Sequence, residues 1–182
     1  MKFDSRDVAL TAVFAALYVI INVVQMAAIG NPTVYGPVQL RIADCLIALS
    51  ALLGGPVIGG VTLGCVITNG YYFLSIQDVV LGPLANLLAA TMIFLLRKHR
   101  FVACVIGALP IGLIVGGYLW LFLPPPDVLN MMPAWSAMIV SITISSLISI
   151  AGFGYVLLSA LSRPSVMKPL KSHGLKVVAE GA

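Results

Sequence analysis

The chain has 182 residues, of which 60% are hydrophobic and 9% are charged, and its formal net charge is +4. Soluble domains carry about a quarter charged residues, so this composition excludes an ordinary soluble domain and is typical of an integral membrane protein. Apart from Arg41, the basic residues gather at the N-terminus, at residues 97–100 and in the C-terminal tail. An even number of spans would place these three sites on one side of a membrane. The pattern therefore follows the positive-inside rule and argues against a nucleic-acid partner.

Long runs without charged residues predict an all-α protein with six membrane-spanning helices. The first begins after a charged start, in which Asp4 or Ser5 can cap the helix. The predicted spans are 8–29, 40–53, 57–74, 78–96, 102–123 and 134–161. The second span would be about 21 Å of helix. Because that is short for a bilayer, it requires support from neighbouring helices or a re-entrant loop.

An inside N-terminus places both termini in the cytoplasm and the loops 30–39, 74–77 and 124–133 outside. Residues 1–163 are then one transmembrane domain, and residues 164–182 are a loosely ordered, basic cytoplasmic tail. Aromatic residues favour the membrane interface, and those expected at the outer one are Tyr71, Tyr72, Tyr118, Trp120 and Trp135.

Polar side chains concentrate toward the outer ends of the first four predicted spans. Arg41 and Asp44 open the second span as i,i+3 neighbours, and Asp78 and Asn86 share a face of the fourth. The other members of the group are Asn22, Gln25, Gln39, Thr68, Asn69 and Gln77. A bare charge in hydrocarbon costs about 2.5–3.5 kcal/mol. The cluster therefore predicts a polar cup, open to the outside, lined by the first four helices and floored by apolar residues.

Simpler explanations stay open for parts of this cup. Arg41 and Asp44 can form a structural ion pair at the interface. Asn69 or Asn86 can bridge two helices, which contributes about 0.6 kcal/mol on average. A serine stripe on the sixth span, at 141, 145 and 149, favours helix packing over chemistry.

A cup on one side is not a pore. Carriers coupled to protons or ions usually bury ionisable groups near the membrane midplane, and this chain has none there. It also lacks the Gly-x-x-x-x-Gly-Lys phosphate loop. These features favour a substrate-binding membrane subunit that takes its energy from partner proteins.

Small residues offer contact surfaces on the inner side. Ala12 and Ala16 have small-xxx-small spacing near the inner end of the first span, which suits either docking to another protein or packing within the chain. Packing within the chain is the expectation for most of the glycine pairs, Gly55/Gly59, Gly60/Gly64 and Gly112/Gly116.

Four segments between residues 12 and 96 resemble a known family. They are "AALYVIINV", "YGPVQLRIADCLIAL", "GGPVIGGVTLGCVITN" and "DVVLGPLANLLAATMIFLL". They resemble the queuosine-precursor (QueT-type) substrate-binding S components of energy-coupling factor transporters, with "GPxQxRxxD/E" and "GxxLGCxIxN" as the specific combination. This family favours Glu where the chain has Asp44, and the last two spans look generic.

The resemblance implies a six-helix S-component bundle in the cell membrane that binds a 7-deazaguanine base used to make a modified tRNA nucleoside. It implies a transmembrane coupling protein and two cytoplasmic ATPases as partners, docked on the small residues of the first helix, here Ala12 and Ala16. No cofactor, metal or catalytic residue is expected, and the protein is not expected to be an enzyme.

The chemistry of such a base suits the cup. A guanine-like edge offers adjacent N–H donors, which a carboxylate can accept in a two-pronged arrangement. Asp44 or Asp78 can supply that carboxylate, and Arg41 can orient Asp44 or bind the carbonyl oxygen. The remaining expected contacts are polar groups and stacking rings: Gln39, Asn69, Asn86, Tyr35, Tyr71 and Tyr72.

Other functions stay open. An S component can carry another small vitamin-like solute, although the absence of a His/Cys/carboxylate cluster disfavours a metal cargo. An intramembrane enzyme needs a nucleophile–base pair or a metal, and no outer-face histidine supplies the base. A purely structural membrane subunit would leave the polar cup without an evident use.

Overall fold

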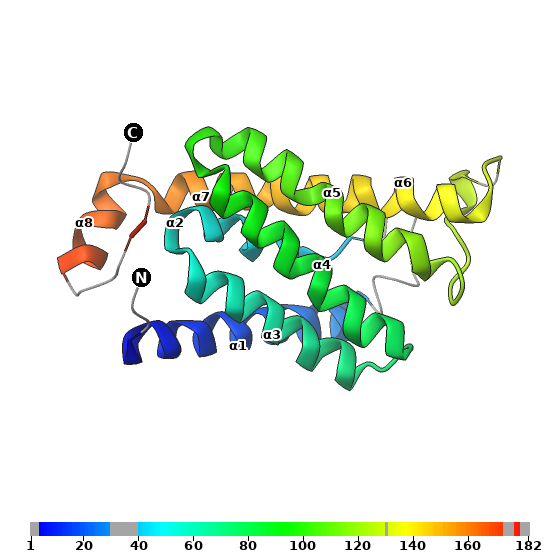
Figure 1. The fold of residues 1–182 in the computed structure, drawn as a ribbon, viewed down its shortest axis with the longest axis horizontal. Helices are drawn as coiled ribbons and strands as arrows, with labels where there is room; N and C mark the ends of the chain where they lie inside the picture. The colour runs from blue at the N-terminus through cyan, green and yellow to red at the C-terminus, as the bar shows by residue number, and fades with distance from the viewer. Residues whose placement is uncertain (1–3, 30–39, 130, 173–176, 179–182) are drawn as a thin grey trace.

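The computed structural model describes residues 4–29, 40–129, 131–172 and 177–178. Every regular element in these ranges is helical, in agreement with the predicted all-α class (Figure 1). The helices are α1 (Ser5–Ile29), η1 (Ile42–Leu49), α2 (Ser50–Leu53), α3 (Gly55–Tyr71), α4 (Ile76–Leu95), η2 (Arg97–His99), α5 (Arg100–Leu119), η3 (Asp127–Leu129), α6 (Ala134–Ser146), η4 (Leu147–Gly154), α7 (Tyr155–Leu161) and α8 (Pro164–Ser172).

Within the described residues, four helical stretches are long and apolar enough to cross a membrane: Ser5–Ala28, Ile76–Leu95, Arg97–Leu119 and Ala134–Leu161. The η1–α2 segment is a shorter apolar helix, and α3 has 17 residues. The count of six spans and the cytoplasmic location of both termini therefore stay predictions.

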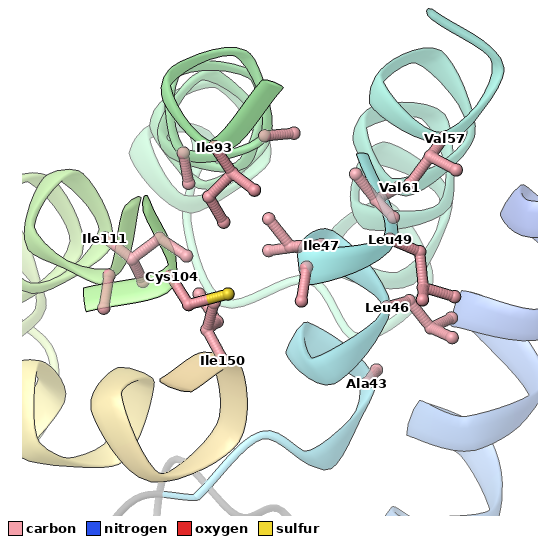
Figure 2. Close-up of a cluster of buried hydrophobic side chains, with 14 of the residues drawn as sticks. Ala43, Leu46, Ile47, Leu49, Val57, Val61, Ile93, Cys104, Ile111 and Ile150 are labelled. Carbon is pink, nitrogen blue, oxygen red and sulfur yellow. The ribbon is translucent and has the colours of Figure 1, made fainter. Parts of the chain in front are cut away.

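The short η1–α2 segment lies at the centre of the bundle. Figure 2 shows side chains of η1 surrounded by labelled residues of α3, α4, α5 and η4, and Ala43 and Ile47 of η1 have no exposed surface. Apart from Asp44 and Ser50 the side chains of this segment are apolar, and a helix with apolar residues on every face is stable only when it is enclosed. Its neighbours thus supply the support that its shortness requires.

The 3₁₀ helix η1 and the π-helical segment η4 pack closely at Gly154. A Cβ atom built on Gly154 would lie 2.8 Å from Cβ of Ala48 and 2.9 Å from the carbonyl oxygen of Cys45. Real Cβ atoms do not approach so closely, so a residue without a side chain is required here. Long 3₁₀ runs and π-segments are both uncommon and often mark functional regions, and no sequence pattern predicted either one.

Small residues also let the longer helices approach one another. A Cβ on Gly64 of α3 would lie 2.7 Å from Cβ of Tyr18 on α1, and one on Gly112 of α5 would meet Thr143 of α6. The expectation that Gly60/Gly64 and Gly112/Gly116 serve packing within the chain is confirmed.

The two ends of the bundle differ in charge. The first turn of α1, the α4–α5 turn and α8 lie at one end, and the α5–α6 connection lies at the other (Figure 1). The basic residues at the first end include Arg6, Arg97, Lys98, Arg100, Lys168 and Lys171. Asp4 caps α1 there by accepting from the backbone N–H groups of Arg6 and Asp7. Helix α8 occupies part of the predicted tail and was not predicted from the sequence.

Candidate functional site

A cavity lies between η1 and the surrounding helices, toward the end of the bundle opposite α8. It encloses about 50 Å³, on a scale where one water molecule takes about 10–15 Å³, so several water-sized groups fit inside. Its polar lining residues are Asn22, Arg41, Asp44, Thr68, Asn69, Tyr72, Asp78, Ser145 and Ser146. The apolar ones are Met26, Leu74, Ile111, Val115 and Ile142.

Asp44 is held by a buried relay of side chains from three elements. The hydroxyl of Tyr18 on α1 donates to Oδ1 of Asp44 at 2.7 Å, and Nδ2 of Asn86 on α4 donates to the Tyr18 oxygen at 3.0 Å. Because Asn86 supplies the proton for its own bond, the Tyr18 proton is committed to Asp44. Tyr18 has no exposed surface, and Asp44 and Asn86 are each 3% exposed. Such a satisfied network fixes the carboxylate in one orientation.

Arg41 is held by a second connection, which runs to α3 and α4. Its Nη2 donates to Oδ1 of Asn69 at 3.0 Å, and Nδ2 of Asn69 donates to the carbonyl oxygen of Asp78 at 2.9 Å. Asn69 therefore uses both groups of its side-chain amide: the oxygen accepts from the Arg41 guanidinium, and the nitrogen donates to the first turn of α4. In the described part of the chain, Arg41 makes this bond and forms no salt bridge with Asp44.

Asp78 is positioned by the fifth helix. The hydroxyl of Tyr118 donates to Oδ1 of Asp78 at 2.7 Å, and the backbone N–H of Asp78 donates to Oγ of the N-cap residue Ser75 at 3.1 Å. Tyr118 is 6% exposed, and Asp78 is half-buried. One carboxylate oxygen is thus held by the protein, while the residue lines the cavity.

Gln25 fixes the beginning of η1. Its Oε1 accepts from the backbone N–H of Ile42 at 3.0 Å, and its Nε2 donates to the carbonyl oxygen of Leu40. Arg41 lies between these two anchored residues in an extended conformation, with φ −99° and ψ 101°. The α1 side chain therefore holds the backbone from which Arg41 and, one turn later, Asp44 reach the cavity.

The structure brings most of the predicted site residues together. Arg41, Asp44, Asn69, Tyr72 and Asp78 all line the cavity. Asn86 does not line it and acts on Asp44 through Tyr18. Tyr71 is 77% exposed and is not among the lining residues. Tyr35 and Gln39 lie outside the described residues.

Two sequence-based expectations need correction. The cavity is not lined by the first four helices alone, because α5 contributes Ile111 and Val115 and α6 contributes Ser145 and Ser146. Tyr118 is not an interface aromatic, because it is buried and bonds Asp78.

Tyr18 is the main residue that sequence reasoning missed. It lies on the same face of α1 as Asn22 and Gln25, at helical spacings of four and three. That spacing was the available signal. The residue type alone gave no signal, because a tyrosine ring also suits an apolar core or an interface.

Two further questions about the site concern metal binding and the buried serine hydroxyls. Within the described residues, no three His, Cys, Asp or Glu side chains gather closely enough to hold a metal ion. The buried hydroxyls of Ser141 and Ser149 have no hydrogen-bond partner in the described structure. Helix packing thus remains the better interpretation for these two, whereas Ser145 lines the cavity.

Taken together, the cavity offers carboxylate and amide oxygens as acceptors, one guanidinium and amide groups as donors, and an apolar wall from α5 and α6. A planar polar molecule with several N–H donors matches this set better than an anion or an apolar compound does.

A family model described as "QueT transporter" matches residues 8–163 of the chain. Neither the comparison with curated proteins nor that with solved structures gives a match. The matched range includes every described residue of the cavity.

Proposed function

Since this chain belongs to the QueT transporter family, we propose that it is the substrate-binding S component of an ATP-driven importer of the energy-coupling factor type. Its substrate is a 7-deazaguanine precursor of a modified tRNA nucleoside, and the protein is not itself an enzyme. The observation that carries the proposal is the cavity with two separately fixed carboxylates, Asp44 and Asp78, inside a helical bundle of this family.

The donor groups of a 7-deazaguanine fit the acceptors of the cavity. Its ring N–H and exocyclic amine can bond one carboxylate in a two-pronged arrangement. Arg41 and the amide of Asn69 are suited to its carbonyl oxygen, and Tyr72 is suited to stack on its plane. The apolar wall of Ile111, Val115 and Ile142 can cover the opposite face of the ring.

In this proposal the cavity faces the outside of the cell, and the protein crosses the plasma membrane six times. The concentration of basic residues at the opposite end of the bundle supports that orientation. Short helices can complete the bundle where longer ones enclose them, as α1 and α4 enclose η1–α2.

A coupling protein and two cytoplasmic ATPases would drive the import. The exposed face of α1 near the basic end supplies a docking surface for the coupling protein, with Ala12 and Ala16 exposed beside Val13 and Leu17. Small residues on an exposed transmembrane face allow another helix to approach closely. The opposite face of α1, with Phe14 and Tyr18, is buried against α3.

Calorimetric titration of the purified protein in detergent tests this function. We expect saturable binding of 7-aminomethyl-7-deazaguanine or 7-cyano-7-deazaguanine and no binding of thiamine, with guanine as the control for the unsubstituted purine. Absence of heat with both deazaguanines, from protein that remains folded, would overturn the substrate assignment.

A further inference from the structure

The formal charges of the residues that line the cavity do not sum to zero. Among the described lining residues, Arg41 is the cation, and Asp44 and Asp78 are the carboxylates. Residues 30–39, which connect α1 to η1, contain no Asp, Glu, Lys or Arg and so add no formal charge. With both carboxylates ionised, the site has one negative charge that no described lining residue compensates.

The two carboxylates lie at different depths. Asp44 is 3% exposed and is tied through Tyr18 to Asn86. Asp78 precedes Asn86 by eight residues on α4, a separation of about 12 Å along the helix axis. Asp78 is half-buried and is therefore the more exposed of the two carboxylates.

Asp78 also has capacity for a further donor. Tyr118 donates to its Oδ1, and its Oδ2 accepts no hydrogen bond from the described residues. The guanidinium of Arg41 is directed to Asn69, whose amide reaches the backbone of Asp78 and not its carboxylate. Asp78 thus has a neutral phenol as its hydrogen-bond partner, and no cation among the described residues forms a salt bridge with it.

Building on the function proposed above, we propose that the cavity selects 7-deazaguanines whose 7-substituent carries an ammonium group over those with a neutral substituent. The donor edge and the 7-substituent lie on the two different rings of the base, so they can reach two separate carboxylates. Asp44 accepts hydrogen bonds from the donor edge, and Asp78 binds the ammonium group. Tyr118 is a positioning residue that orients the carboxylate of Asp78.

The preference follows from the energetics of a partly buried carboxylate. A charge-assisted hydrogen bond is about twice as strong as a neutral one, and an ionised group enclosed without a counter-charge is destabilised. A ligand with an ammonium group satisfies Asp78. A nitrile at the same position leaves Asp78 uncompensated and excludes some of the water that otherwise solvates it.

The test compares two ligands that differ at this substituent. For the unmodified protein we expect 7-aminomethyl-7-deazaguanine to bind about 10- to 100-fold more tightly than 7-cyano-7-deazaguanine. Asp78→Asn should bring the two dissociation constants to within about threefold of each other. Tyr118→Phe should reduce the preference in part, because the carboxylate remains but is less well aimed. Asp127→Asn, an exposed carboxylate outside the cavity, is the matched control and should keep the full preference.

The outcomes separate this inference from the function on which it rests. Equal affinities for the two ligands in the unmodified protein, or tighter binding of the nitrile, would overturn the charge preference and leave the transport function standing. An unchanged preference in Asp78→Asn would overturn the assignment to Asp78, and measurable nitrile binding by that variant would show that it is folded. Binding of neither ligand would overturn the proposed function and this inference with it.

Discussion

Replacing Tyr18 with Phe removes one hydroxyl from the centre of the relay and keeps the ring that packs against α3. That hydroxyl makes the 2.7 Å bond to Asp44 and the 3.0 Å bond from Asn86. A hydrogen bond to a charged group contributes about 1.5–3 kcal/mol and a neutral one about 0.5–1.5 kcal/mol. Bonds between membrane helices average about 0.6 kcal/mol, because the unfolded chain in the membrane also finds partners.

These limits give an expected loss of about 1–3 kcal/mol in the free energy of unfolding for Tyr18→Phe. Ligand affinity should fall about tenfold, which corresponds to 1.4 kcal/mol, because Asp44 loses the donor that orients it. The assays are thermal unfolding in detergent and calorimetric titration with 7-aminomethyl-7-deazaguanine.

Tyr155→Phe is the matched control for this substitution. Tyr155 is half-buried and contacts the ring of Phe101 edge-on at 5.3 Å, and its hydroxyl makes no hydrogen bond within the described residues. The control should keep the stability and affinity of the unmodified protein. If Tyr18→Phe behaves in the same way as this control, the relay does not orient Asp44 and the reasoning is refuted.

Two further predictions concern the partner surface and the core. Changing both Ala12 and Ala16 to Trp should lower substrate uptake at least about tenfold in cells that carry the coupling proteins, and should leave substrate binding by the purified protein intact. Val24→Trp, on the exposed face farther along α1, is the control. Full uptake by the double variant would refute the docking surface. Gly154→Ala should lower the free energy of unfolding by about 1–3 kcal/mol, because its Cβ would overlap η1. Gly117 has open space around it, so Gly117→Ala should be neutral or stabilising when both variants are compared by thermal unfolding. Equal midpoints for these two variants would contradict the close contact between η1 and η4.

Much of the fold follows from local features of the sequence. Charge-free runs and turn residues such as Gly54 predicted where the helices lie, because apolar length and chain breaks are local properties. The short second helix also followed from the length of its apolar run. The π-segment and the long 3₁₀ helix did not, because their geometry results from contacts with distant residues such as the one between Gly154 and Ala48.

The site was predictable to the extent that its polar residues follow helical spacing. Arg41 and Asp44 were identified because charges at the start of an apolar segment require a reason. Tyr18 and Tyr118 were missed as site residues because their partners are 26 and 40 residues away in the sequence. The contributions of α5 and α6 were missed because their cavity residues are apolar or are small hydroxyls, which resemble ordinary packing residues.

The most direct test of the binding site is titration of Asp44→Asn beside the unmodified protein, with 7-aminomethyl-7-deazaguanine as the ligand. The substitution keeps the shape of the side chain and the oxygen that accepts from Tyr18, while it removes the negative charge and replaces one acceptor with a donor. We expect saturable binding by the unmodified protein and at least about tenfold weaker binding by the variant, with similar thermal unfolding. Equal affinity of the two proteins would show that Asp44 does not bind the donor edge of the base, and would contradict the assignment of Asp44 as the carboxylate that recognises the substrate.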